Sequence, residues 1–194
     1  MPLAASELRR GRICYAVYPF VPSFPLSVAD DGGREEAGDV EAFARARRGR
    51  HTRILAEGRL RPVLLLHDGT RGEHEDVICL RVNAVKERHR RVAATWRRIE
   101  MQEHPFFFLL PAGRRGSGLA RDSVISLSSV GAIHKTAILG PRPAGQLGRD
   151  EMRAISDRLS LVLSLDLAPK IAARAEELLR RAGLGQAPRP SGRA

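Results

Sequence analysis

Short apolar runs, separated by stretches rich in glycine, proline and polar residues, recur through the first 140 residues. This pattern restricts the fold more than any other feature of the chain. Residues 13–18 are rich in aromatic and β-branched side chains and are stopped by Pro19, as is typical of a strand. Residues 60–66 form a nearly continuous apolar run, which favours a strand buried on both faces. We predict further strands at 76–82, 106–110 and 123–130.

The spacing of apolar residues becomes helical in the last part of the chain. Met152, Ile155 and Leu159 fall on one face of a helix that begins near Gly148. A second helix is expected at 171–182. The predicted fold is therefore α+β and β-dominated: a small half-open SH3-like β-barrel of five to seven strands, with a C-terminal helix and an extra terminal helix.

The sequence divides into two expected parts. Residues 1–166 form the barrel domain, interrupted by a charged insertion at about 27–58, in which Asp39 is placed to cap a short helix. Residues 167–194 form the extra helix and a disordered, basic Pro/Gly-rich tail. The pattern between 85 and 103 has helical spacing with arginines between the apolar residues.

The 194 residues carry a formal net charge of +11. Such a field attracts polyanions, and nucleic acid is the expected partner. Only three of the 33 basic residues are lysines, so an arginine-rich proteome is the alternative explanation. Cys14 and Cys79 each sit in an apolar run and are expected to be buried hydrophobes rather than a disulfide or metal pair. We find no signal peptide and no apolar run that would span a membrane, so a cytoplasmic protein is expected.

Several short segments occur in an informative order. They read Arg-Gly-Arg-Ile-Cys-Tyr-Ala-Val at 10–17, Gly-Arg-Leu-Arg-Pro-Val-Leu-Leu-Leu at 58–66, Pro-Phe at 105–106, Gly-Leu-Ala-Arg-Asp-Ser-Val at 118–124 and Ala-Ile-His-Lys at 132–135. Taken in this order, they resemble the PemK/MazF family of toxin–antitoxin ribonucleases, also called mRNA interferases.

This resemblance implies metal-independent cleavage of single-stranded RNA, with no cofactor. The ribose 2′-hydroxyl attacks the adjacent phosphate and leaves a cyclic phosphate. Arg61 matches the Arg-Pro arginine of the family, which is assigned to phosphate stabilisation and proton transfer. A guanidinium suits this role because it offers a planar fork of charged donors to phosphate oxygens. The resemblance also implies a homodimer, growth inhibition by the free toxin, and neutralisation by an acidic antitoxin.

The chain departs from the family at the other catalytic positions. No threonine ends the third strand, where only Asn83 or Arg81 can donate hydrogen bonds. The acid of the later strand falls on Ser128, and the arginine after it falls on Gly131. Glu57 lies about one residue out of register with another expected acid.

Two histidines are candidates for the missing base. Because histidine titrates near neutral pH, His134, or His67, is a possible replacement. His67 also lies near His74, Glu75 and Asp76, but their spacing matches no metal-ligand signature and indicates a polar turn. The candidate catalytic residues are thus Arg61, Asn83, Ser128 and His134.

Basic residues elsewhere predict the path of RNA. The candidate contacts are Arg59, Arg81, Arg88, Arg91, Trp96 and Lys135, with Trp96 offering one stacked base. The alternative for 85–103 is an amphipathic helix that buries Trp96 and leaves a solvated arginine face.

The sequence is also compatible with two other functions. The first is a catalytically degenerate barrel that binds RNA, DNA or a protein. The second is gyrase poisoning of the CcdB type, for which the final residues carry no Trp-Gly-Ile-like signature.

Overall fold

The structure is a computed structural model that describes residues 1–20, 25–30, 33–46, 53–69, 75–114 and 116–165. Its main sheet is antiparallel and, among these residues, has seven strands in the order β10-β1-β5-β6-β8-β7, with β9 also paired to β1. The strands are β1 (Arg12–Pro19), β5 (Gly58–Leu65), β6 (Asp76–Ala84), β7 (Phe107–Leu110), β8 (Ser123–His134), β9 (Ile138–Leu139) and β10 (Gly145–Gln146).

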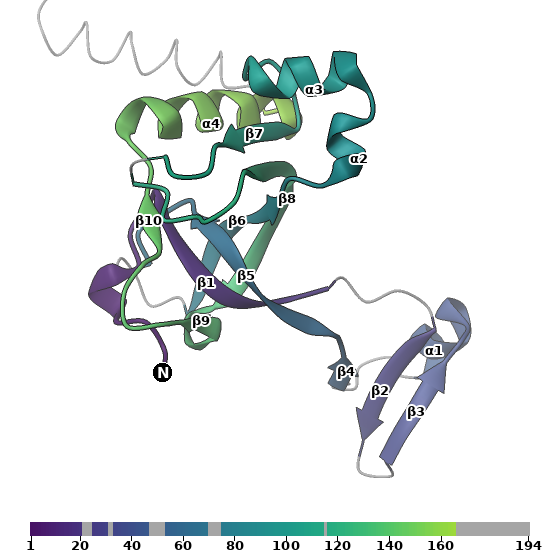
Figure 1. Cartoon of the computed structure of the whole chain (residues 1–194). Coiled ribbons are helices and arrows are strands. Elements are labelled where there is room, and N and C mark those ends of the chain that lie inside the picture. The colour runs from purple at the N-terminus through teal and green to yellow at the C-terminus, as the bar shows by residue number, and fades with distance from the viewer. Residues whose placement is uncertain (21–24, 31–32, 47–52, 70–74, 115, 166–194) are drawn as a thin grey trace, which may run out of the picture.

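The sheet is strongly twisted, and within the described residues no ladder joins β7 to β10 (Figure 1). The predicted α+β, β-dominated fold with a half-open arrangement of strands is therefore confirmed, and the strands do not close into a complete barrel. The five predicted strands correspond to β1, β5, β6, β7 and β8. Strand β8 continues to His134, past its predicted end at residue 130.

A separate three-stranded sheet lies beyond the start of β5, away from the main sheet (Figure 1). It contains β2 (Leu26–Asp30), β3 (Gly33–Ala37) and β4 (Arg53–Leu55), with β2 in the middle, and it is accompanied by α1 (Val40–Ala46). The Asp39 carboxylate accepts hydrogen bonds from two backbone N–H groups of α1, at 2.8 and 3.1 Å, so the predicted cap is present. The strands of this charged insertion were not predicted.

Helices cover the opposite end of the main sheet (Figure 1). They are α2 (Glu87–Arg90), α3 (Ala93–Glu100) and α4 (Arg149–Val162), and two short 3-10 turns, η1 (Ala5–Glu7) and η2 (Lys135–Ala137), lie elsewhere. The predicted terminal helix is α4, whereas the helical pattern at 85–103 forms two helices instead of one. The predicted helix at 171–182 lies outside the described residues.

The two faces of the main sheet bury separate apolar clusters. Ile13 and Leu64 are paired across β1 and β5, and both are fully buried against α4. Their neighbours Cys14 and Val63 point to the other face, as the alternation of a strand requires, and pack with Leu3 of the N-terminal segment. The central part of the 60–66 run is therefore buried on both faces, as predicted.

Both cysteines are buried free thiols, as expected. Burial raises the pKa of Cys14 to about 11 and that of Cys79 to about 12. These thiols are packing residues and not nucleophiles.

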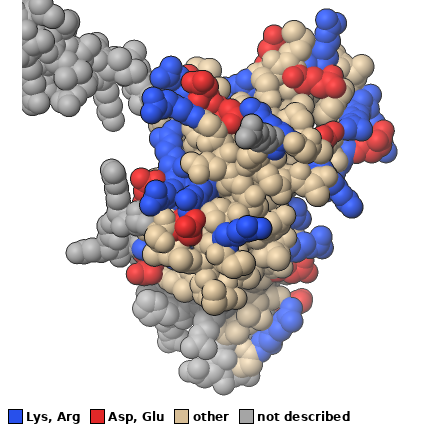
Figure 2. All heavy atoms as spheres, turned by 60° about the vertical axis from the view of Figure 1, so that its left-hand side comes forward, with Lys and Arg blue, Asp and Glu red and all other residues tan. Residues whose placement is uncertain are grey.

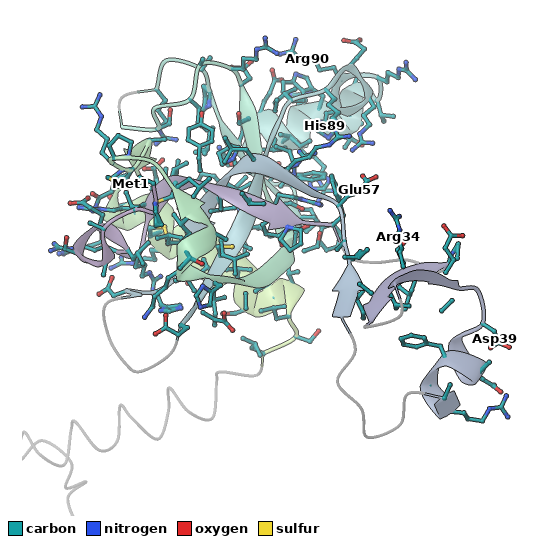
Figure 3. The ribbon with its side chains drawn as sticks, turned by 90° about the horizontal axis from the view of Figure 1, so that it is seen from below. Met1, Arg34, Asp39, Glu57, His89 and Arg90 are labelled. Atoms are coloured by element: carbon teal, nitrogen blue, oxygen red, sulfur yellow. The ribbon has the colours of Figure 1, made fainter. Side chains whose placement is uncertain are left out.

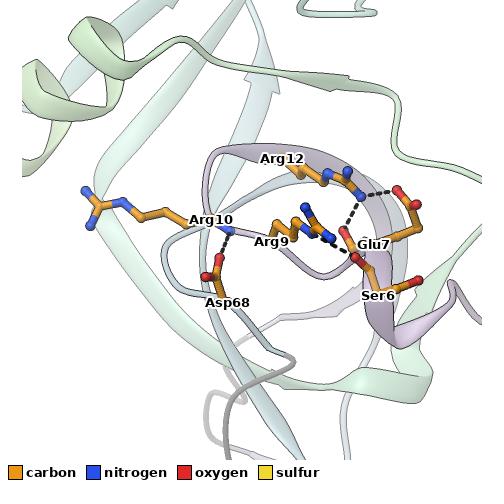
Figure 4. A network of polar contacts seen from close by, with 6 residues as sticks. All are labelled: Ser6, Glu7, Arg9, Arg10, Arg12 and Asp68. Carbon is orange, nitrogen blue, oxygen red and sulfur yellow. Dashed lines mark hydrogen bonds and ion pairs between the residues drawn. The ribbon is translucent and has the colours of Figure 1, made fainter.

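Several N-terminal arginines hold the first turn of the chain in place (Figure 4). The Arg12 guanidinium forms an ion pair with the Glu7 carboxylate and donates to its carbonyl oxygen at 3.0 Å. The Arg10 backbone N–H donates to Asp68 at 2.8 Å, and its side chain donates to Ser156 of α4 at 2.6 Å. Part of the net positive charge is thus used to fix the N-terminus on the sheet.

Candidate nucleic-acid interface

A bulge between β6 and β8 places polar side chains beside the central strands. In the β6–β8 ladder, Leu80 pairs with Val130 and Val82 pairs with Ile125. On β6 only Arg81 lies between these two pairs, whereas on β8 residues 126–129 lie between them and have no partner on β6. Arg81 Nη2 donates to Ser129 Oγ at 3.1 Å. The serines of this bulge are linked, because the Ser126 and Ser129 hydroxyls lie 3.0 Å apart.

The neighbouring strand brings Arg61 to the same place. Val63 of β5 pairs with Arg81 of β6, and two residues further along Arg61 Nη1 donates to Asn83 Oδ1 at 3.3 Å. The Nε atoms of Arg61 and Arg81 are buried and have no hydrogen-bond partner among the described residues. In each guanidinium, one Nη contacts a neighbour, and the other has no hydrogen-bond partner in the same part of the chain.

These side chains line a pocket of about 270 Å³, which we call the arginine pocket. Its lining residues are Phe20, Arg61, Arg81, Asn83, Lys86, Arg88, His89, Phe107, Val124 and Ser126. Four of them are cationic, and no carboxylate is among them. Such a cavity is suited to an anion with several oxygens, because it offers charged and neutral hydrogen-bond donors from different directions.

Phe20 supports the arginine side chains at the edge of the pocket. The guanidinium carbons of Arg59 and Arg61 lie 5.6 and 5.5 Å from its ring centroid, within cation–π distance. Its backbone N–H donates to the Glu57 carbonyl oxygen at 2.8 Å. Glu57 itself is exposed and marks the junction with the small sheet, where Arg34 and Asp39 lie (Figure 3). Sequence reasoning missed Phe20, whose only signal was an aromatic residue directly after Pro19.

His89 is another pocket residue that the sequence did not single out, as are Lys86 and Ser126. It lies on the same side of the molecule as Glu57, away from Met1 (Figure 3). Its Nδ1 accepts a hydrogen bond from the Lys86 backbone N–H at 3.1 Å, which caps α2. Burial lowers the pKa of His89, and the positive charges of Arg88 and Lys86 lower it further. The helical pattern at 85–103 contained this histidine, but no local pattern indicated that it lines the same pocket as Arg81 and Asn83 of β6.

Of three other predicted residues, one lines the arginine pocket and two are exposed outside its lining. Arg88 is one of its lining residues. Ser128 is exposed, and its hydroxyl lies 3.5 Å from that of Ser126. Arg91 is exposed just after the end of α2, and its backbone N–H donates to the Glu87 carbonyl oxygen.

Trp96 is used mainly for packing. It is half-buried against the apolar cluster of Ile99, Leu109 and Val124, and the Arg90 guanidinium lies 5.1 Å from its ring centroid. The alternative prediction, an amphipathic helix that buries Trp96, thus fits α3 at Trp96 and at Ile99, which is buried. Val92, just before the helix, is exposed. A ring that already contacts the core on one face and Arg90 on another has little surface left for a stacked base.

The structure does not bring His134 or Lys135 to the arginine pocket. His134 pairs with Asp76 at one end of the β6–β8 ladder, and Asn83 pairs with Val124 near the other end. At about 3.3 Å per residue, these positions are about 23 Å apart along β6. His134 instead contacts the Thr136 hydroxyl at 2.7 Å.

Two further candidate positions have structural roles. His67 Nε2 accepts a hydrogen bond from the Ile78 backbone N–H at 3.0 Å, so this ring nitrogen is occupied. Gly131 stands where the family often has arginine, and a Cβ there would lie 2.5 Å from the Tyr18 hydroxyl oxygen. The Tyr18 side chain therefore fills the space that a larger residue at 131 would need.

Charge alone does not locate a binding site on this molecule. On the face drawn in Figure 2, Lys and Arg side chains form several clusters with Asp and Glu side chains between them.

The described residues contain no group of three or more His, Cys, Asp or Glu side chains that would hold a metal ion. In the same part of the chain, no helix is long and apolar enough to cross a membrane.

No family model matches the chain, and no curated protein matches it. Among solved structures, an endoribonuclease in complex with its cognate antitoxin from a Mycobacterial species is 13% identical, with 81% of this chain and 95% of that chain covered and a TM-score of 0.41. The Mycobacterium tuberculosis toxin MazF-mt6 is 20% identical, with 56% and 90% covered and a TM-score of 0.39. A MazE-MazF structure from Deinococcus radiodurans is 14% identical, with 81% and 96% covered and a TM-score of 0.44.

These names are those of the family that the sequence motifs resemble. At such identities and TM-scores the likeness carries no argument for function, which must rest on the residues of the chain.

Proposed function

We propose that this chain is a toxin-type endoribonuclease that binds single-stranded RNA in the arginine pocket and cleaves it without a metal. The observation that carries the proposal is the pocket itself: Arg61, Arg81, Lys86 and Arg88 line one cavity, and no carboxylate is among its described lining residues. The hydrogen bond between Arg61 and Asn83 holds one guanidinium in position before any ligand binds. A preorganised set of donors suits the extra negative charge of a pentacovalent phosphate.

The chemistry assigned to the pocket is an internal transesterification. The ribose 2′-oxygen attacks the adjacent phosphorus, and the bond from phosphorus to the 5′-oxygen breaks. The departing 5′-oxygen takes a proton from water, so the step leaves a 2′,3′-cyclic phosphate and a 5′-hydroxyl. Arg61 and Arg81 stabilise the phosphorane, while Asn83 and the bulge serines, including Ser126 and Ser128, donate hydrogen bonds.

The proton of the 2′-hydroxyl passes to water in this account, because no carboxylate is among the described residues that line the pocket and His134 is distant. The rate should therefore rise with pH without levelling off between roughly pH 6 and 7, where a histidine base would become fully deprotonated.

The experiment is incubation of purified protein with a mixed-sequence RNA in EDTA, followed by analysis of the product ends. Fragments that carry 2′,3′-cyclic phosphate and 5′-hydroxyl ends support the proposal. Intact RNA after prolonged incubation counts against it, and so do fragments with 3′-hydroxyl ends.

A second candidate is a catalytically degenerate module that binds nucleic acid or protein through the same pocket. The observation that favours it is the absence, among the lining residues, of a group free to accept a proton. Asn83 Oδ1 already accepts from Arg61, and His89 Nδ1 already accepts from Lys86. Binding of RNA or DNA without any cleavage would identify this function.

We also propose two partners. An acidic antitoxin is expected because a free ribonuclease toxin is lethal to the cell that makes it, and a net charge of +11 attracts an acidic chain. A homodimer is expected from the family resemblance. Expression without growth arrest in a bacterium would contradict the need for an antitoxin, and light scattering that gives a monomer at micromolar concentration would contradict the dimer.

A further inference from the structure

Two histidines flank the ring of Phe107 at the start of β7. The ring centroid of His89 lies 5.5 Å from that of Phe107, and the centroid of His104 lies 4.9 Å from it. Each histidine also accepts a backbone hydrogen bond at Nδ1, from Lys86 at 3.1 Å for His89 and from Phe106 at 3.2 Å for His104. The two rings therefore share the same type of backbone hydrogen bond and the same aromatic neighbour.

These backbone contacts fix the tautomer of both rings. A backbone N–H can only donate, so Nδ1 must carry a lone pair, and the proton of the neutral ring resides on Nε2. Burial lowers the pKa of both histidines, and neighbouring positive charges lower it further. At neutral pH both rings are therefore neutral and present Nε2–H as a hydrogen-bond donor.

The two histidines differ in what they face. His89 lines the arginine pocket and His104 does not. Nε2 of His89 has no hydrogen-bond partner in the described part of the chain. The other polar or charged residues of the pocket come from three strands and one helix. Arg61 belongs to β5, Arg81 and Asn83 to β6, and Ser126 to β8. Arg88 belongs to α2, and Lys86 is the residue before that helix.

All of these groups can donate hydrogen bonds, so the pocket needs an acceptor with several oxygens. We propose that Nε2–H of His89 donates to a non-bridging phosphate oxygen of RNA bound in the arginine pocket. His89 is then a phosphate-binding residue that acts together with Arg61 and Arg81. This inference rests on the proposed function and adds a contact to the same site.

The geometry also decides against His89 as a proton acceptor. A proton could enter the ring only at Nδ1, where it would displace the Lys86 N–H and break the cap of α2. The new charge would also lie close to Arg88 and Lys86.

The first test uses the unmodified protein and a short single-stranded RNA with 2′-O-methyl groups, which cannot be cleaved. NMR titration should show that the bound RNA raises the pKa of His89, because a nearby phosphate favours the protonated ring. The pKa of His104 should not change. Binding of the RNA with both pKa values unchanged would overturn the proposal.

The second test compares variants by their affinity for the same RNA. His89→Ala should weaken binding about tenfold or more, the loss typical of one hydrogen bond to a charged group. His104→Ala is the matched control and should stay within about threefold of the unmodified protein.

His89→Gln should retain most of the affinity, because glutamine can cap α2 through its oxygen and donate through its amide nitrogen. Equal losses for His89→Ala and His104→Ala would overturn the inference alone. Failure of the unmodified protein to bind the RNA would overturn the proposed function with it.

Discussion

Salt should weaken RNA binding by an amount set by the cations of the arginine pocket. Four cationic side chains line it, namely Arg61, Arg81, Lys86 and Arg88. Each ionic contact of a cation with the phosphates of a single strand contributes about −0.7 to the slope of log affinity against log salt, so four contacts give about −2.8. Affinity should then fall about 50-fold between 50 and 200 mM salt by this relation.

Removing one of these cations should reduce the slope by one contact. For Arg61→Ala we expect a slope of about −2.1, which corresponds to a loss of about 18-fold over the same salt range. Arg97 is an exposed arginine of α3 outside the pocket, so Arg97→Ala is the matched control and should leave the slope near the original value. Fluorescence anisotropy with a labelled, uncleavable RNA measures all three slopes. Identical slopes for the two variants would refute the assignment of the pocket as the RNA contact.

Three predictions concern the fold. Leu64 is fully buried, so Leu64→Ala should lower the free energy of unfolding by about 2–5 kcal/mol in urea titrations. Leu60 is 59% exposed and serves as the control, and an equal loss for Leu60→Ala would contradict the packing. A Cβ on Gly118 would overlap the Ala144 carbonyl oxygen, whereas Gly113 has a similar positive φ but open space around it. Gly118→Ala should therefore cost at least about 3 kcal/mol and Gly113→Ala only about 1–2 kcal/mol, and thermal melts that rank them the other way would be inconsistent with this backbone contact. Because burial raises the pKa of both cysteines, about one thiol in a thousand or fewer is ionised at pH 8, and iodoacetamide should label the native protein far more slowly than the unfolded one.

The five longer strands of the main sheet and α4 were predictable because local spacing encodes them, whereas the two-residue strands β9 and β10 are too short to show such spacing. The apolar run at 60–66 and the helical spacing of Met152, Ile155 and Leu159 each have one strong structural interpretation. The small sheet was missed because β3 reads Gly-Arg-Glu-Glu-Ala, which has no apolar alternation. Its stability comes from pairing with β2, and such pairing is not visible in a short window.

The candidate site was predicted where it depends on neighbouring strands and missed where it depends on distant contacts. Arg61 and Asn83 meet because β5 and β6 are antiparallel neighbours. His89 and Phe20 reach the same pocket from a helix and from the end of β1, and no spacing rule links those segments. His134 was expected near the site, but β8 is long and carries it to the opposite end of the sheet.

The central claim is that Arg61 stabilises the transition state of RNA cleavage, and single-turnover kinetics test it most directly. With RNA at saturating protein concentration in EDTA, Arg61→Ala should cleave at least about a hundredfold more slowly than the unmodified protein, the usual loss when one preorganised donor to a developing anion is removed. Arg61→Lys should also be slow, because an ammonium group cannot replace the guanidinium fork. Arg97→Ala should cleave at the original rate. Cleavage by Arg61→Ala at the rate of Arg97→Ala would contradict the account.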